Sequence, residues 1–332
     1  MTGAGSAPEI ALCIASYNEA EWLARMLGSL RAGGSPGGIE VVVGDSASTD
    51  GTARLLRRRF RWVRCVVTPF NGGYSTALNA AIRASAAPFA VAANADLELA
   101  PAALYTLREA LLADPEAFGA VPRLLNSDGT PQGSLDHFPT LAGVLQTALR
   151  GSPVPPAVPA EGAPFPIETG TGACVMYRRE RLEQVGLLDE RFFLYFEEAD
   201  LHYRLRQRAG HLLAVPRAVV THHGGKSTGG RTLRNVQQHL VSLFYFMQKH
   251  HGPAAETAVR VAMAGGYAGR AVLSALNELV RAASAVAPGE PMAEQGRLRW
   301  SPTEYAALLW TCVRMWRETE RGVEPRARAL TP

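Results

Sequence analysis

The sequence predicts an α/β fold with a mostly parallel sheet flanked by helices, followed by a helical C-terminal extension. Apolar, strand-like runs alternate with helix-like segments from Ile10 onward, which is typical of crossover connections between parallel strands. From Arg231 onward the pattern is helical only. The chain has 332 residues, 47% hydrophobic and 19% charged. This composition allows a sizeable core and excludes collagen-like, coiled-coil and wholly disordered classes.

Four short apolar runs in the first hundred residues are expected to be strands. They are Ile10–Ala15, Ile39–Val43, Val63–Val67 and Phe89–Ala93. A helix-like segment follows each of them, the first ending at Leu30 and the others covering Thr52–Phe60, Ser75–Ser85 and Pro101–Ala113. The last of these helices opens with a proline, which is tolerated in a first turn. Polar loops therefore join each predicted strand to its helix.

The second part of the chain begins with a proline-rich stretch, Pro153–Pro166, that is expected to be an extended loop. Further strands are expected at Glu168–Tyr177, Leu212–Val215 and Ala218–Thr221, and helices at Arg179–Val185 and Glu198–Ala209. The C-terminal helices are expected at Val236–His250, Ala255–Val286 and Thr303–Glu320. We therefore expect a catalytic-type α/β domain over residues 1–230 and a helical extension over residues 231–332.

The charge balance gives little sign of a nucleic-acid partner. Lysine and arginine number 34 against 30 acidic residues, a net charge of +4. The densest arginine cluster lies between Arg54 and Arg64 and has no DNA-reading motif around it, so we expect no nucleic acid among the partners.

Features that direct a protein out of the cytoplasm are not seen in the sequence. The four cysteines are widely spaced and form no disulfide pattern, which favours a reducing compartment. Residues 1–8 do not resemble a signal peptide, and no run of about 18 apolar residues is present. We expect a cytoplasmic protein.

Polar residues directly after the predicted strands are the first candidates for a binding site, because ligands bind at the carboxyl ends of strands in open α/β sheets. These residues are Ser16, Tyr17 and Glu19 after the first strand, Asp45 after the second, Asn71 after the third, and Asn94 and Asp96 after the fourth. The first strand is followed by Ser-Tyr-Asn-Glu instead of Gly-x-Gly-x-x-Gly, which disfavours a dinucleotide site.

Two of these carboxylates suit different parts of a nucleotide ligand. Asp45 can accept hydrogen bonds from a base or ribose, and Asp96 can hold Mg²⁺ or Mn²⁺, hard ions that combine one or two carboxylates with phosphate oxygens. The alternative is that each aspartate only caps a turn or a helix.

A further acidic group, Glu197, Glu198 and Asp200, follows the aromatic run Phe192–Phe196 and begins a predicted helix. A carboxylate there is a candidate general base. The alternative is that these residues stabilise the first helical turn, with Asp200 paired to Arg204.

After the predicted closing strands comes the segment His222–Ser227. His222 is a candidate metal ligand, and Lys226 or Ser227 could contact phosphate. An ordinary polar loop is the alternative.

Seven segments in order resemble the family 2 glycosyltransferases, and among these the bacterial rhamnosyltransferase-like enzymes. The segments are Ile10–Glu19, Val43–Gly51, Asn71–Asn79, Asn94–Asp96, Gly170–Ala173, Phe192–Leu201 and His222-x-x-Gly225-x-Ser227. The resemblance implies a GT-A fold, a nucleotide-diphospho-sugar donor, a divalent metal and inversion at the anomeric carbon.

The same resemblance implies roles for individual residues. Ser16 and Glu19 would line the nucleotide pocket with Tyr17 and Asn71, and Asp45 would contact the base. Asn94 and Asp96 occupy the DxD position, and Asp96 and His222 would hold Mg²⁺ or Mn²⁺. Gly172 would lie near the donor and acceptor. Glu198 falls at the position of the catalytic base, where aspartate is commoner, and Asp200 is the competing candidate.

The mechanism implied is a single displacement in which Glu198 takes the proton of an acceptor hydroxyl. The resemblance favours a dTDP- or UDP-sugar as donor, with dTDP-rhamnose as one candidate, and leaves a sugar, a lipid-linked compound or a small metabolite as acceptor. A nucleotidyltransferase and a non-catalytic sugar-nucleotide-binding protein are the alternatives. The C-terminal helices could pack on the catalytic domain, form a homodimer contact or lie on the inner face of the membrane.

Overall fold

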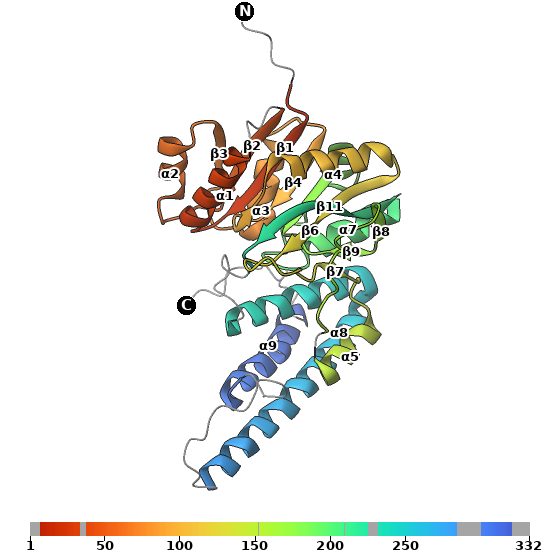
Figure 1. The fold of residues 1–332 in the computed structure, drawn as a ribbon. Coiled ribbons are helices and arrows are strands. Elements are labelled where there is room, and N and C mark those ends of the chain that lie inside the picture. The colour runs from red at the N-terminus through yellow and green to blue at the C-terminus, as the bar shows by residue number, and fades with distance from the viewer. Residues whose placement is uncertain are drawn as a thin grey trace, which may run out of the picture. The chain divides into compact units, whose positions relative to one another are not determined.

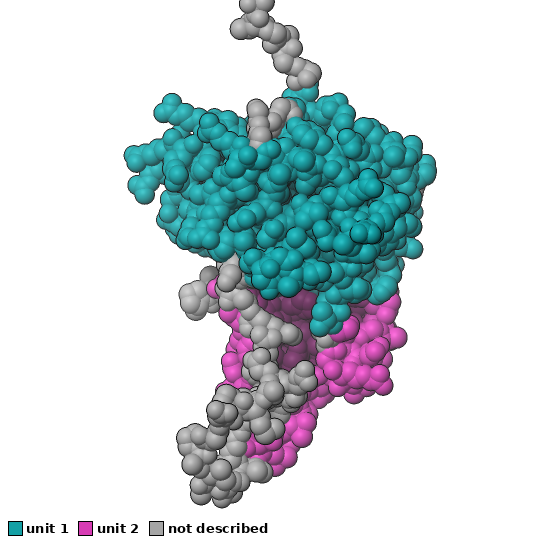
Figure 2. Space-filling model, viewed as in Figure 1, with its two compact units in different colours: residues 1–138, 154–231, 327–332 teal, residues 139–153, 232–326 magenta. Residues whose placement is uncertain are grey.

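The computed structural model describes residues 7–33, 38–151, 153–208, 210–224, 232–283 and 300–320. The chain divides into two compact units, coloured separately in Figure 2. The first contains residues 1–138 and 154–231, and the second contains residues 139–153 and 232–326. The segment 139–153 thus groups with the C-terminal helices, a long-range association that the expected division at residue 230 does not include.

A nine-stranded sheet organises the first unit, in the order β3-β2-β1-β4-β10-β6-β11-β5 with β8 paired to β11. Its first four strands are parallel: β1 (Ile10–Ser16), β2 (Ile39–Asp45), β3 (Val63–Val67) and β4 (Phe89–Ala93). Each is followed by a helix, in turn α1 (Ala20–Ala32), α2 (Thr52–Arg59), α3 (Gly73–Arg83) and α4 (Pro101–Ala113). Figure 1 shows this alternation, which agrees with the sequence prediction.

The rest of the sheet mixes parallel and antiparallel pairs. β10 (Cys174–Arg178) runs antiparallel to β4 and to β6 (Ala117–Leu125), whereas β11 (His211–His222) is parallel to β6. β5 (Leu97–Glu98) and β8 (Phe165–Ile167) both run antiparallel to β11. A separate pair joins β7 (Leu135–Asp136) to β9 (Thr169–Gly170), and the helices α6 (Arg179–Val185) and α7 (Glu197–Arg208) complete the unit.

Alternating residues of β1 enter different hydrophobic clusters, as the two-residue period of a strand requires. Ile10, Leu12 and Ile14 pack with residues of α1 and α4, while Ala11 and Cys13 pack with residues of α3, α6 and α7. Every residue of β1 is buried. Helices therefore cover both faces of the sheet, and the carboxyl ends of its parallel strands are left to the loops that carry the candidate site.

Several elements differ from the sequence prediction. The expected strand Glu168–Tyr177 is broken into β9 and β10, and the two expected closing strands form one strand, β11, with an irregular register between Val215 and Val219. β6 was not predicted, because Gly119 and Pro122 are poor strand formers. It nevertheless pairs on both sides, with β10 and β11.

The second unit is helical and consists of α5 (Leu141–Arg150), α8 (Leu233–Ala283) and α9 (Pro302–Glu320). α8 is kinked at Gly252, which has a φ of 84° and precedes Pro253. α5 was not predicted, although Thr140 is a recognisable N-cap whose hydroxyl accepts a hydrogen bond from the Gly143 N–H. None of the helices in the described ranges meets the length and hydropathy needed to cross a bilayer.

Candidate functional site

The ends of β1 and β2 bring Ser16 and Asp45 together, because the two residues are register partners across the parallel pair. Both are buried, with 3% and 1% of their surface exposed. One oxygen of Asp45 accepts a hydrogen bond from the Ser48 hydroxyl. The other, Oδ2, and the Ser16 Oγ have no hydrogen-bond partner within the described residues. Burial raises the pKa of Asp45, an effect that Ser48 opposes.

The loops after these two strands are tied together by Asn18. Its backbone has a φ of 54°, in the left-handed region that asparagine tolerates, and its side-chain oxygen accepts a hydrogen bond of 2.7 Å from the Thr49 N–H. Next to it, Glu19 Oε2 lies 3.4 Å from the Tyr17 N–H, and Tyr17 is 44% exposed. Tyr17 and Glu19 thus flank the junction of the two loops.

Asn71 connects the loop after β3 to the end of β2. Its Oδ1 accepts hydrogen bonds from the Ser46 hydroxyl at 3.1 Å and from the Gly73 N–H at 3.0 Å. Gly73 has a φ of 82°, and a Cβ at this position would lie 2.1 Å from the Phe193 carbonyl oxygen. Only glycine fits there, so the start of α3 can approach the aromatic run that precedes Glu198.

Asp96 and His222 lie together beyond the end of β4. The Asp96 side chain is fully buried, and its Oδ1 is 3.4 Å from His222 Nε2. The other ring nitrogen of His222 is 2.7 Å from Gln132 Oε1. The Asn94 N–H donates to the Ala173 carbonyl at 3.0 Å, which links this segment to Gly172. Gly225, Lys226 and Ser227 lie outside the described residues.

One carboxylate and one imidazole, both candidate cation ligands, thus lie side by side. Within the described ranges, no three or more His, Cys, Asp or Glu residues form a group that could hold a metal. Mg²⁺ and Mn²⁺ commonly combine one or two protein ligands with water and with phosphate oxygens of a substrate.

Glu198 follows two aromatic residues in unusual backbone conformations. Tyr195 and Phe196 have φ values of 70° and 65°, which are strained for bulky side chains. Glu198 Oε1 accepts a hydrogen bond of 3.3 Å from the Gly172 N–H, and its Oε2 has no hydrogen-bond partner in the described part of the chain. A Cβ on Gly172 would lie 3.2 Å from that of Glu198, so the close approach requires glycine or a shift of its neighbour.

Burial raises the pKa of both Glu198 and Glu197, in the second case to well above the ordinary range and with a contribution from the Glu198 charge. Tyr74 donates a 3.3 Å hydrogen bond to the Gly172 carbonyl. Its own pKa is raised by burial and by the two glutamates, which keeps the hydroxyl protonated. Glu198 is therefore a weakly solvated carboxylate with one oxygen anchored by the Gly172 N–H.

Asp200 is held differently from Glu198. It is fully buried and accepts a 2.8 Å hydrogen bond from the Arg204 guanidinium, which also donates to the carbonyls of Val185, Gly186 and Leu187. The predicted Asp200–Arg204 pair is therefore present. Its contacts connect α7 to the segment after α6, a structural role.

Two residues that lie beside these candidates, His202 and Gln132, were not predicted from the sequence. His202 bridges the Thr169 and Tyr177 hydroxyls, each at 2.7 Å, and burial lowers its pKa to about 3, so it remains neutral. Gln132 lies in the region between residues 113 and 153, where the sequence analysis assigned no element. Local spacing carries no signal for either residue, because both act through partners 25 to 90 positions away.

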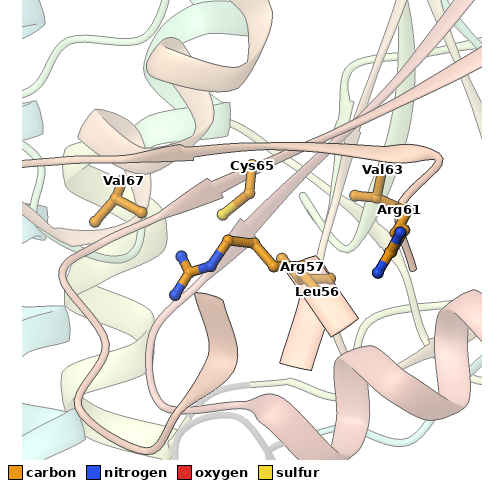
Figure 3. Close-up of a pocket in the computed structure, with 6 residues that line it drawn as sticks. All are labelled: Leu56, Arg57, Arg61, Val63, Cys65 and Val67. Carbon is orange, nitrogen blue, oxygen red and sulfur yellow. The ribbon is translucent and has the colours of Figure 1, made fainter. Parts of the chain in front are cut away.

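A separate cavity of about 410 Å³ lies between α2 and the edge strand β3. Figure 3 shows Arg57 and Arg61 beside the row formed by Val63, Cys65 and Val67. None of the candidate site residues described above lines this cavity.

The family model described as "Glycosyl transferase family 2" matches residues 11–186, just over half of the chain. An N-acetylglucosaminyl-diphospho-decaprenol L-rhamnosyltransferase of Mycobacterium tuberculosis is 29% identical over 286 residues, covering 80% of this chain and 92% of the relative. The low-salt glycan biosynthesis hexosyltransferase Agl10 of Haloferax volcanii is 36% identical over 87 residues, 26% of each chain.

Among solved structures, the mannosyltransferase PcManGT of Pyrobaculum calidifontis, in complex with GDP-Man and Mn²⁺, matches with a TM-score of 0.54. The two sequences are 22% identical, and the match covers 94% of this chain and 88% of that one. This likeness concerns the fold.

Proposed function

Because this chain belongs to glycosyl transferase family 2, we propose that it transfers a sugar from a nucleotide-diphospho-sugar to an acceptor hydroxyl with inversion of configuration. The comparisons confirm four predictions: the family, its rhamnosyltransferase-like character, the α/β GT-A-type fold and the assignment as a glycosyltransferase. Donor, metal, base and acceptor are the parts that we propose. The nucleotidyltransferase and the non-catalytic binding protein are less consistent with the family.

The donor nucleotide is proposed to bind over the ends of β1 to β3. The buried Ser16 Oγ and Asp45 Oδ2 would gain their missing hydrogen bonds from a base such as thymine or uracil. Tyr17, Glu19 and Asn71 border the same loops. The Asn94 N–H donates to the carbonyl of Ala173, the residue after Gly172, and the sugar is proposed to lie near these residues. A dTDP- or UDP-sugar, with dTDP-rhamnose as one candidate, is the proposed donor.

Asp96 and His222 are proposed to hold Mg²⁺ or Mn²⁺ with the donor diphosphate. A buried carboxylate beside an imidazole nitrogen, 3.4 Å apart, suits these ions when phosphate oxygens complete the shell. Such a cation supplies positive charge that stabilises the departing nucleoside diphosphate. Asp96 and His222 would thereby determine where the diphosphate binds.

Glu198 is the proposed general base, and the observation that carries this proposal is its geometry. One oxygen is anchored by Gly172, and the other is free to receive a proton. As the acceptor oxygen bonds to the anomeric carbon, the bond from that carbon to the diphosphate oxygen breaks, and the hydroxyl proton passes to Glu198. Asp200, paired with Arg204, is proposed to position α7.

A lipid-linked diphosphate sugar is the proposed acceptor, because the mycobacterial relative is named for N-acetylglucosaminyl-diphospho-decaprenol. The predicted cytoplasmic location, at the inner face of the membrane, would give access to such a substrate. A homodimer through the C-terminal helices stays a prediction.

Contact with the membrane is proposed at the arginine cluster of α2 and β3. Six arginines there are exposed: Arg54, Arg57, Arg58, Arg59, Arg61 and Arg64. No acidic residue occurs in the sequence from Gly51 to Ala95, and within the described residues none of the six forms an ion pair. Trp62, 37% exposed, directly precedes β3, and Phe70, 65% exposed, lies three residues after its end. Arginine with exposed aromatic side chains suits an anionic bilayer surface.

Vesicle sedimentation tests this contact. Replacing Arg57, Arg58 and Arg61 by alanine should weaken binding to anionic phospholipid vesicles by roughly a hundredfold, at about 1 kcal/mol per arginine. Arg25→Ala, at an arginine paired with Glu21 on α1, is the control. Equal binding by the triple variant, or preference for DNA over vesicles, would contradict the proposal.

Calorimetric titration with nucleotide sugars tests the donor assignment. We expect a dTDP- or UDP-sugar to bind in the presence of Mg²⁺ or Mn²⁺ and to lose affinity in EDTA. Release of nucleoside diphosphate during turnover supports sugar transfer, whereas release of pyrophosphate would identify a nucleotidyltransferase. Absence of binding by all nucleotide sugars tested would contradict the proposed function.

A further inference from the structure

The turn between β6 and β7 contacts two histidines at the end of β11. Gln132 Oε1 is 2.7 Å from His222 Nδ1, and Ser127 Oγ is 2.7 Å from His223 Nδ1. The two histidines have different partners on their other ring nitrogens. His222 Nε2 faces Asp96, whereas His223 Nε2 is 3.0 Å from Glu98.

The orientation of the Gln132 amide follows from its other contacts. Its Nε2 lies 2.9 Å from Asn126 Oδ1 and 3.3 Å from the His222 carbonyl oxygen, and both of these atoms can only accept hydrogen bonds. The Asn126 amide is oriented in turn, since its Nδ2 donates to Thr130 Oγ1 at 3.0 Å and to the Pro131 carbonyl at 3.4 Å. The Gln132 carbonyl oxygen must therefore be the atom that faces His222.

This orientation determines which nitrogen of His222 carries the proton. An amide oxygen only accepts, so His222 Nδ1 must be the donor in the 2.7 Å hydrogen bond. In the neutral ring the lone pair then belongs to Nε2, which faces Asp96 Oδ1 at 3.4 Å. Two electron-rich atoms directed at each other favour a cation that both can contact.

We propose that Gln132 is a positioning residue that selects the Nδ1–H tautomer of His222 and thereby presents Nε2, together with Asp96, to the divalent cation. The inference rests on the proposed function for the identity of the cation. It adds a residue, from a turn 90 positions away in sequence, that determines whether His222 can act as a ligand. Loss of such a partner typically lowers metal affinity 10- to 100-fold, and we expect a loss of roughly that size here.

The neighbouring Ser127 provides a matched control. It belongs to the same turn and makes the same kind of hydrogen bond, but to His223, which pairs with Glu98 instead of Asp96. Ser127→Ala therefore disturbs the turn without altering the tautomer of His222. Gln132→Met keeps the length of the side chain and removes the acceptor.

The first measurement uses the intact protein without metal. Nitrogen-15 NMR of histidine-labelled protein at about pH 8.5, where free imidazole is neutral, reports which ring nitrogen is protonated. His222→Gln assigns the signals. We expect His222 in the Nδ1–H form in the wild type and in Ser127→Ala, and a shift toward the Nε2–H form in Gln132→Met. An Nε2–H tautomer in the wild type overturns the inference, whether or not any variant folds.

The second measurement is Mn²⁺ binding, with the metal alone, followed by the electron paramagnetic resonance signal of the free ion. We expect Gln132→Met to bind 10- to 100-fold more weakly than the wild type and Ser127→Ala to bind equally well. Unchanged affinity in Gln132→Met overturns the inference. If the wild type has the Nδ1–H tautomer but no form binds Mn²⁺, tautomer selection is supported and the proposed metal role fails.

Discussion

The two halves of the sheet place their candidate side chains in different ways. In the parallel half, Ser16 and Asp45 are the last residues of β1 and β2, and strand pairing alone brings them together, while Asp96 lies three residues after β4. In the mixed half, Glu198 depends on Gly172 and His222 depends on Gln132. Local sequence places the residues proposed to contact the nucleotide, whereas long-range contacts position the proposed base and one of the two proposed metal ligands. Substitutions in the two halves should therefore affect different steps.

The largest effect is expected from Glu198→Gln, which keeps shape and removes the base. Turnover should fall about a thousandfold, because a positioned general base contributes 10²- to 10⁴-fold. The dissociation constant of the donor, measured by calorimetry, should change less than about threefold, since Glu198 is not among the residues proposed to hold the donor. Turnover within tenfold of the wild type would remove Glu198 from the base role.

Asp200→Asn tests the competing carboxylate two positions away. Removing the negative charge leaves the Arg204 guanidinium without its buried counter-charge, so the folded state should lose about 3 kcal/mol. Thermal unfolding measures this loss. Assayed at a temperature where the variant is folded, turnover should stay within about tenfold of the wild type. A fully folded variant without turnover would instead make Asp200 the base.

The parallel half is tested by Asp96→Ala. The affinity for the donor in Mg²⁺ or Mn²⁺ should fall roughly a hundredfold, because the cation loses its carboxylate. In EDTA the wild type and the variant should bind the donor equally. Equal affinities in the presence of metal would contradict the proposed role of Asp96.

The sequence predicted the parallel half well because its signals are local. The strands Val63–Val67 and Phe89–Ala93 are short apolar runs that end in polar loops, and the helix Pro101–Ala113 opens with a first-turn proline. The mixed half was predicted less well. β6 contains Gly119, where a Cβ would lie 2.8 Å from the Met176 carbonyl, so that close packing against β10 requires the residue that weakens the strand signal.

The same distinction applies to the site. Asp45, Asp96, Glu198 and His222 were predicted as candidate site residues from motifs, and their roles stay predictions. Gln132 and Tyr74 were not, because their significance lies in which atom they contact across the fold, Nδ1 of His222 and the carbonyl of Gly172. Periodicity and spacing describe one segment at a time and do not reveal such pairs.

The pH dependence of activity sharpens the description of the mixed half. Burial raises the pKa of Glu198, and a base must be ionised to accept a proton. The value of kcat/KM should therefore fall about tenfold per pH unit below a pKa that lies above the usual 4.5 of glutamate. In Asp200→Asn the same limb should persist. If kcat/KM instead falls only at or below pH 4.5, the usual pKa of glutamate, burial does not determine the pKa of the base.

The smallest effect is expected from Glu197→Gln. Glu197 is 5% exposed, and its pKa is raised well above the ordinary 4.5, chiefly by burial. Below about pH 4.5 the carboxyl is neutral in both folded and unfolded protein, so the variant and the wild type should be equally stable. As the pH rises above the pKa of Glu197 in the unfolded chain, the unfolded wild type ionises readily and the folded wild type does not. The wild type therefore loses stability until the pH passes the pKa of Glu197 in the folded protein.

At pH 8 Glu197→Gln should therefore be more stable than the wild type by about 1 kcal/mol, seen as a Tm higher by roughly 2–4 °C. Its turnover should be retained, because the proton of the acceptor is assigned to Glu198. Equal Tm values of Glu197→Gln and the wild type at pH 8 would show that the Glu197 carboxylate does not destabilise the folded protein. If Glu197→Gln is more stable than the wild type but has no turnover, Glu197 and not Glu198 is the general base.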